Sequence, residues 1–195
     1  PIQKDLSLLR LFYDMGVRYM TLTHAGNNEI CDSCATKEKR WNGLSPFGIE
    51  VVKEMNRLGM LVDVSHISDA AFYDVLKYSV APVVATHSCC RALSDHPRNL
   101  TDEMIVALAK NGGVIQINFY PPFLNKSYAD IFWPLCEEFE AVEAKYKTDK
   151  PKYQEEYKAA LEKLNAIKKP SYKEIVDHID HVVKLVGASH VGIGS

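Results

Sequence analysis

The stretch LVDVSHISDAAFYDVLKYSVAPVVATHS, residues 61–88, decides the fold because two apolar, β-branched runs within it each end on a histidine. The runs cover residues 61–66 and 82–87 and predict two strands. Between them, Ser68 predicts the cap of a helix whose apolar residues recur at helical spacing. A connection of this kind nearly always joins parallel strands by a right-handed crossover.

The two strand-end histidines, His66 and His87, are therefore expected to lie side by side at the carboxyl edge of a parallel sheet. This edge is where α/β enzymes collect their ligand-binding residues, so the pair is a candidate metal site. The alternative is that each imidazole forms a hydrogen bond to a neighbouring loop and has no further role. The residues alone leave both interpretations open.

Three further strands are predicted outside this unit. They cover residues 17–23, 114–119 and 190–195, and the first of them also ends on a histidine, His24. Strands that alternate with amphipathic helices predict an α/β fold of the (β/α)8 TIM-barrel type, with a doubly wound open sheet as the alternative. No glycine-rich phosphate loop follows any predicted strand, which argues against a nucleotide-binding sheet.

Composition limits the function further. The 195 residues are 47% hydrophobic and 25% charged, with a formal net charge of −2, which suits a single domain over residues 1–195. The absence of a basic face excludes nucleic acid as a partner. No apolar run approaches the roughly 20 residues of a transmembrane segment. Residues 131–169 are dense in Glu and Lys and predict a charged helical hairpin inserted at the surface.

The five cysteines show no disulfide framework. Cys31 and Cys34 form a CxxC pair within a long polar loop at residues 25–44, and Cys89 and Cys90 closely follow the second strand-end histidine. A four-thiolate zinc site would normally need two CxxC pairs, and adjacent cysteines chelate one tetrahedral ion poorly. A loop dithiol, a disulfide and free thiols all remain open for the CxxC pair.

Several short motifs together carry a resemblance that none would carry alone. In chain order they are GVRYMTLTH, GLSPFG, VVKEMNRLGMLVDVSH, ATHS, HPRNLTD, INFY and GASHVGIGS. Over nearly the whole chain except the charged insertion, the sequence resembles the membrane (renal) dipeptidase family of zinc metallopeptidases. The resemblance implies a (β/α)8 barrel with two zinc ions at the carboxyl ends of its strands. It also implies hydrolysis of the peptide bond of dipeptides through a metal-bridging hydroxide.

The resemblance implies roles for five residues. His66 and His87 match the two histidines that ligate the second zinc ion, in agreement with their strand-end positions. His24 matches a histidine near the scissile bond, where a donor would stabilise the oxyanion, so it is the candidate catalytic residue. Arg98 matches the arginine that binds the substrate carboxylate, and Tyr120 lies near the family's pocket.

Several family ligands have no counterpart in the sequence. These are an HxD pair on the first strand, a bridging glutamate on the third, and an aspartate directly after the strand that here ends at Ser195. The chain is therefore expected to supply the last five βα units of a barrel and to be inactive alone. Its unpaired strand edges are expected to be covered by the missing strands or by a second copy in a homodimer. The rival functions are another binuclear-metal barrel amidohydrolase and an inert fragment or interaction domain, and the residues leave the compartment open.

Overall fold

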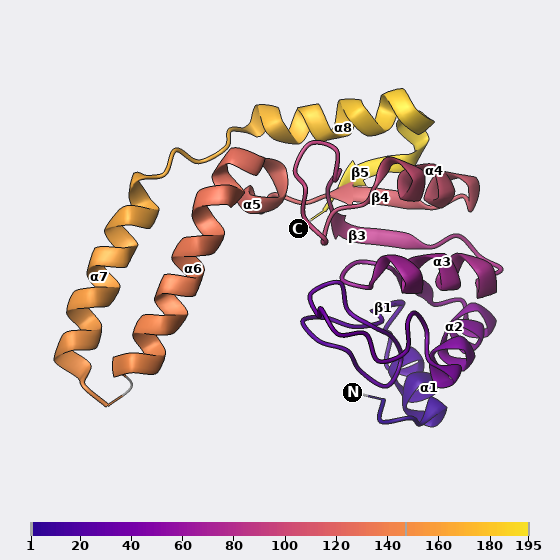
Figure 1. Cartoon of the computed structure of the whole chain (residues 1–195). Helices are drawn as coiled ribbons and strands as arrows, with labels where there is room; N and C mark the ends of the chain where they lie inside the picture. The colour runs from indigo at the N-terminus through magenta and orange to yellow at the C-terminus, as the bar shows by residue number, and fades with distance from the viewer. Residues whose placement is uncertain (1, 147, 195) are drawn as a thin grey trace.

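The computed structural model describes residues 2–146 and 148–194, and its centre is a parallel sheet of five strands (Figure 1). In their order across the sheet, the strands are β1 (Tyr19–Thr21), β2 (Leu61–Asp63), β3 (Val84–Ser88), β4 (Val114–Ile117) and β5 (Val191–Ile193). Every neighbouring pair is parallel. The five predicted strands are thus present, although each is shorter than its sequence pattern; Ser195, predicted to end the last one, lies outside the described residues.

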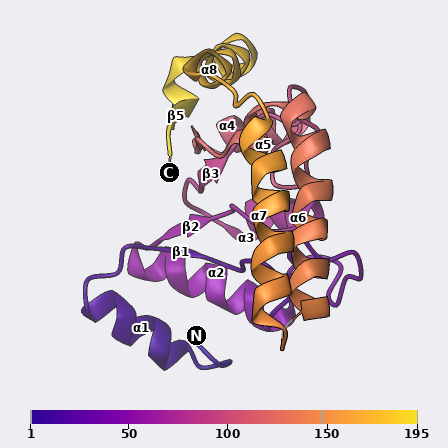
Figure 2. The same ribbon diagram turned by 90° about the vertical axis from the view of Figure 1, so that its left-hand side faces the viewer.

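A row of helices covers one face of this sheet (Figures 1 and 2). In chain order these helices are α1 (Leu6–Asp14), α2 (Pro46–Leu58), α3 (Asp69–Tyr78), α4 (Asp102–Lys110) and α8 (Tyr172–Val186). Each packs against the next, so the helices follow the order of the strands. Parallel strands with their helices all on one side are the arrangement of a (β/α)8 barrel segment, as predicted, and differ from a doubly wound sheet, whose helices cover both faces.

Capping side chains mark where the helices begin, and the predicted cap of Ser68 on α3 is confirmed. The side chains of Ser45, Ser68 and Thr101 each accept a hydrogen bond from the backbone N–H three residues later. Ser171 forms a capping box with Glu174. Such caps satisfy N–H groups that have no partner within the first helical turn. They therefore determine where each helix starts and each preceding loop ends.

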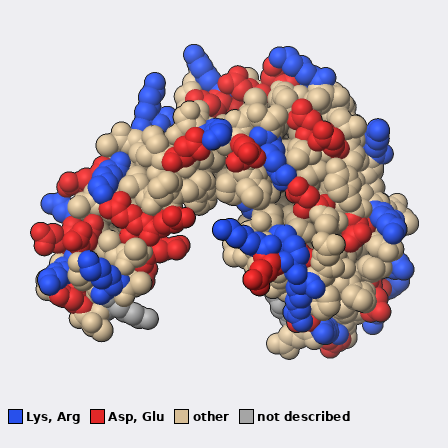
Figure 3. Space-filling model, in the orientation of Figure 1, with Lys and Arg blue, Asp and Glu red and all other residues tan. Residues whose placement is uncertain are grey.

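Helices α6 (Lys126–Tyr146) and α7 (Lys150–Ala166) pack against each other and project away from the sheet (Figure 1). In the sequence they lie between β4 and β5, as do the short helices α5 (Pro121–Leu124) and η1 (Ala188–His190). Acidic and basic side chains are mixed along the pair (Figure 3), and the Lys163–Glu138 ion pair joins the two helices at 2.6 Å. None of the described helices combines the length and the apolar character of a membrane-spanning segment.

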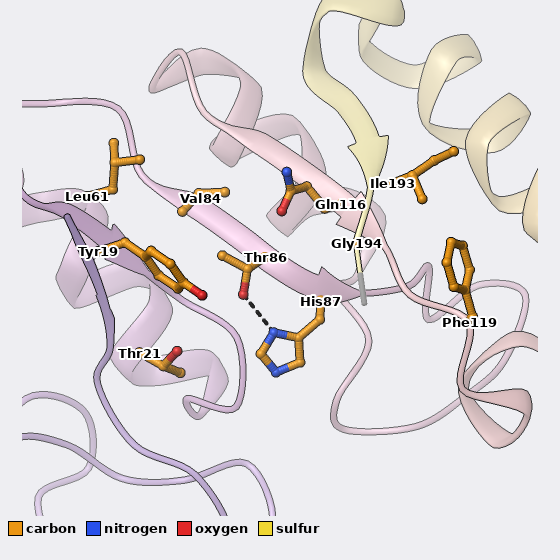
Figure 4. A pocket seen from close by; sticks show the side chains of 10 residues that line it. All are labelled: Tyr19, Thr21, Leu61, Val84, Thr86, His87, Gln116, Phe119, Ile193 and Gly194. Atoms are coloured by element: carbon orange, nitrogen blue, oxygen red, sulfur yellow. Dashed lines mark hydrogen bonds between the residues drawn. The ribbon is translucent and has the colours of Figure 1, made fainter. Parts of the chain in front are cut away.

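The two faces of the sheet differ in their surroundings. Val62, Ala85 and Ile115 face the helices and are at most 1% exposed. The opposite face is open, and on it Tyr19 is 54% exposed and Leu61 50% exposed. A hollow of about 540 Å³ lies over this face (Figure 4). The open face corresponds to the side of a barrel strand that points to the barrel interior.

Candidate active site

His66 and His87 meet at the carboxyl edge of the sheet. His66 follows β2, His87 lies near the end of β3, and their Nε2 atoms are 2.8 Å apart. The ring centroids lie 4.9 Å apart in an edge-on arrangement. The predicted approach of the two imidazoles is therefore confirmed, and their role as metal ligands stays a prediction.

The backbone of His66 is held in an unusual conformation. Its φ of 73° lies in the left-handed region, which residues with a Cβ atom rarely adopt and which costs of order 1–2 kcal/mol. The loop holds this conformation, because the Cys34 N–H donates a hydrogen bond to the His66 carbonyl at 2.8 Å. Strain of this kind persists where surrounding structure over-determines the position, and it is common at functional sites.

Both imidazoles lie in surroundings that favour their neutral form. Burial, assisted by the positive charge of Arg98, lowers the pKa of His66 to about 3. The same two causes lower the pKa of His87. A neutral imidazole has one nitrogen with a free lone pair, which is the form that binds a metal ion.

All five residues that the sequence singled out line one cavity of about 650 Å³. They are His24, His66, His87, Arg98 and Tyr120. The ring of His24 stacks on that of His66 with 4.2 Å between centroids, whereas Tyr120 is 42% exposed and contacts the Phe123 ring. Four loops and strand ends that are distant in sequence thus contribute to one site.

Arg98 is a buried cation with unused hydrogen-bonding capacity. It is only 7% exposed, and its Nη2 donates to the His87 carbonyl at 2.8 Å. Its Nε–H, which is also buried, has no partner among the described residues. The guanidinium lies 5.4 Å from the centre of the Phe123 ring. A buried cation without a counter-ion is costly, so this position favours an anionic ligand.

A second cavity of about 590 Å³ adjoins the first and shares His24, His66, Arg98 and Phe123 with it. Its outer wall includes Trp133 of α6, which stacks on His96 at 5.1 Å between centroids. Sequence reasoning missed Trp133, because it predicted a charged surface hairpin over residues 131–169 and gave no role to the tryptophan within it. Only its stacking against the loop of residues 96–99, the HPRN loop, shows that Trp133 borders the cavity. No local sequence pattern predicts such a contact.

The loop at residues 25–44 is organised by Asp32, which sequence reasoning also missed. The Asp32 carboxylate is fully buried and accepts hydrogen bonds from the backbone N–H groups of Arg40, Trp41 and Gly43 at 2.8–3.1 Å. The flanking Cys31 and Cys34 are free thiols, and burial raises the pKa of each. The CxxC spacing marked this segment in the sequence, but the residue that organises the loop is the aspartate between the two cysteines.

The residues in place fit part of a metal centre. Two imidazole nitrogens on one tetrahedral zinc, each at 2.0–2.1 Å, would lie about 3.3 Å apart, so a shared ion would require the observed Nε2 atoms, 2.8 Å apart, to separate slightly. Among the described residues, no cluster of three or more His, Cys, Asp or Glu side chains could hold a metal ion. His178 and His181 lie elsewhere, the first buried against Leu124 and Cys90 and the second bonded to Asp102. A catalytic zinc usually has three protein ligands, so His66 and His87 supply only part of the set.

Comparison with known proteins agrees with this geometry. A sequence model described as membrane dipeptidase (peptidase family M19) matches residues 1–195. An uncharacterized dipeptidase of Schizosaccharomyces pombe is 34% identical over 196 residues, covering 100% of the chain and 38% of that protein. The dipeptidase tcpJ of Claviceps purpurea is 37% identical over 189 residues, covering 97% and 35%. The chain thus spans little more than a third of the length of these relatives.

Solved structures of related proteins show the same fold. The probable dipeptidase PvdM from Pseudomonas aeruginosa superposes with a TM-score of 0.81 at 32% identity, over 100% of this chain and 54% of that one. A metallo peptidase from Rhodobacter sphaeroides, liganded with a phosphinate mimic of the dipeptide L-Ala-D-Ala, superposes with a TM-score of 0.72 at 25% identity, over 98% and 46%. The predicted fold class is confirmed.

Proposed function

Because the chain belongs to the membrane dipeptidase family, peptidase family M19, we propose that the protein hydrolyses the peptide bond of dipeptides at a metal centre. One observation carries the proposal. Two neutral imidazoles, a third imidazole and a buried, partly unpaired guanidinium converge on a single cavity at the carboxyl edge of a parallel sheet. This edge is where barrel enzymes carry out their chemistry.

We assign the metal to His66 and His87, which would bind zinc through their Nε2 atoms, with two zinc ions in the complete site. Bound divalent ions of this kind supply an activated water nucleophile and polarise the scissile carbonyl. The two imidazoles need further protein ligands to complete such a site. The resemblance implies that these are the HxD pair and the bridging glutamate found on other strands of the family's barrel.

Arg98 would bind the C-terminal carboxylate of the substrate. Its guanidinium is planar and can form a bidentate pair with a carboxylate, and its surroundings lack a competing acid because no carboxylate lines either cavity among the described residues. An anchored carboxylate would hold the peptide bond at a constant distance from the metal. Such an anchor would favour dipeptides over longer peptides.

His24 would act on the developing oxyanion. Its ring stacks on His66 and lines the cavity beside Arg98. An imidazole N–H there can donate to the carbonyl oxygen as negative charge develops on it. Tyr120 lines the same cavity and would contact the substrate.

The test is to measure bound zinc and hydrolysis of glycine-containing dipeptides by the full-length protein. His66→Gln and His87→Gln should lose both. His181→Gln is the matched control, because this histidine bonds to Asp102 and lies outside both cavities. Turnover of a lactone or phosphotriester without dipeptide hydrolysis would favour another amidohydrolase. A protein with neither zinc nor turnover would refute the proposal in favour of an interaction domain.

A further inference from the structure

Asp63 is a carboxylate buried on the open face of the sheet, and four hydrogen bonds surround it. Its Oδ2 accepts from the hydroxyls of Thr21 at 2.6 Å and Thr86 at 2.7 Å. Its Oδ1 accepts from the backbone N–H groups of Ser65 and Thr86, both at 3.0 Å. The residue is 0% exposed. Four donors occupy the acceptor sites of a carboxylate, so protein groups alone define its hydrogen bonding.

This carboxylate determines the direction in which the Thr86 hydroxyl points. A carboxylate carries no hydrogen and can only accept, so the Thr86 O–H donates to Asp63. The same oxygen, Thr86 Oγ1, lies 2.6 Å from Nδ1 of His87 (Figure 4). Because the hydroxyl hydrogen is already directed to Asp63, Oγ1 accepts from His87, and the ring must carry its hydrogen on Nδ1.

We propose that Asp63 and Thr86 form a relay that holds His87 in the tautomer with a free lone pair on Nε2, the atom that faces His66. Asp63 is then a positioning residue that acts through Thr86. The inference rests on the proposed metal-dependent function, but the tautomer itself is a property of the metal-free protein. Outer hydrogen bonds of this kind typically orient metal-binding histidines.

The relay makes the two imidazoles unequal. His87 is ready to bind, whereas His66 must donate its Nε2–H to His87 across the observed 2.8 Å when no metal is present. Among the described residues, Nδ1 of His66 has no hydrogen-bond partner, so nothing opposes transfer of its hydrogen to that nitrogen. Metal binding therefore requires a tautomer change at His66 and none at His87.

Asp63→Asn should reverse the relay. The amide oxygen must stay beside the two backbone N–H donors, since an NH₂ group there would face other donors. The NH₂ group then takes the place of Oδ2 and donates to both threonine hydroxyls. Thr86 can only respond by donating to Nδ1 of His87, which forces the hydrogen of the ring onto Nε2. The size and shape of the side chain are retained, and the metal-binding lone pair of His87 is lost.

The experiment is ¹⁵N NMR of histidine side chains in metal-free protein at neutral pH, with the His87 signals identified by their loss in His87→Gln. We expect a protonated Nδ1 and an unprotonated Nε2 in the natural protein, and the reverse in Asp63→Asn. Equilibrium dialysis with Zn²⁺ as the probe should show an affinity lowered about 10- to 100-fold in Asp63→Asn. The NMR result does not depend on hydrolysis, so it can fail or succeed separately from the proposed function.

Threonine variants supply the controls. Thr86→Val removes the relay hydroxyl without changing side-chain shape and should leave His87 as a mixture of tautomers. Thr86→Ser keeps the hydroxyl and should retain the Nδ1–H form of His87. Thr21→Val removes the other hydroxyl from the same carboxylate oxygen and should leave the His87 tautomer unchanged. If Asp63→Asn does not fold, this threonine series still decides the question. An Nε2–H form in the natural protein, or equal effects of Thr21→Val and Thr86→Val, would overturn the relay.

Discussion

If Arg98 binds the substrate carboxylate as proposed, replacing it by methionine should remove any preference for substrates with a free carboxyl group. The guanidinium is 7% exposed and its buried Nε–H lacks a partner among the described residues, so a substrate carboxylate would meet a cation that water screens little. Loss of one partner from such a charge-assisted, bidentate pair costs about 3–4 kcal/mol. Because each 1.36 kcal/mol corresponds to a tenfold change in rate, kcat/KM should fall by a factor of about 10²–10³.

The assay compares kcat/KM for a glycine dipeptide and for its C-terminal amide. Arg98→Met should lose about 10²–10³ on the dipeptide and less than about tenfold on the amide, which offers no carboxylate to the guanidinium. Arg98→Lys keeps the charge but loses the planar fork, so its loss should be intermediate. Arg57→Met is the control, since Arg57 pairs with Glu54 at 2.7 Å and lines neither cavity.

Equal losses on the two substrates would refute this reasoning. They would mean that Arg98 acts by holding the His87 carbonyl, to which its Nη2 donates at 2.8 Å, and not by binding substrate. Unfolding of the variant would give the same equal losses, so the thermal transition of each protein must be measured beside the kinetics.

Three further outcomes are expected. His24→Ala should lower kcat by about 10²–10³ with little change in KM, because an oxyanion donor acts mainly in the transition state; steady-state kinetics checks this. Asp32→Ala should lower the free energy of unfolding by about 3 kcal/mol or more, because three backbone N–H groups lose a buried acceptor; urea denaturation measures it. Hydrogen bonds from Arg57 and Arg10 lower the pKa of Glu54 to about 2 from its ordinary 4.5, so Glu54→Gln should destabilise the protein by about 1–2 kcal/mol at pH 7, after allowance for the exposed arginines. Because a lowered carboxyl pKa stabilises the fold above pH 4.5 and loses that contribution as the pH falls towards 2, denaturation curves of Glu54→Gln and the natural protein should converge over that interval.

The sequence by itself determined the elements and their order. Caps at Ser45, Ser68 and Thr101 lie where helices begin, because a capping side chain bonds to a backbone N–H only three residues away. The strand–helix–strand unit placed His66 and His87 at one edge, since the handedness of such a crossover leaves little choice. These features depend on short-range geometry, so a single sequence is enough to predict them.

Only the tertiary structure decided what surrounds those histidines. Trp133 reaches the cavity because α6 packs beside the HPRN loop, although its own segment is charged. Asp63 gains a role only because strand register places it between Thr21 and Thr86 of adjacent strands. Arg98 becomes a buried, partly unpaired cation through contacts made far from it in sequence. Burial and hydrogen-bond direction depend on every neighbour in space, and local periodicity carries no information about those neighbours.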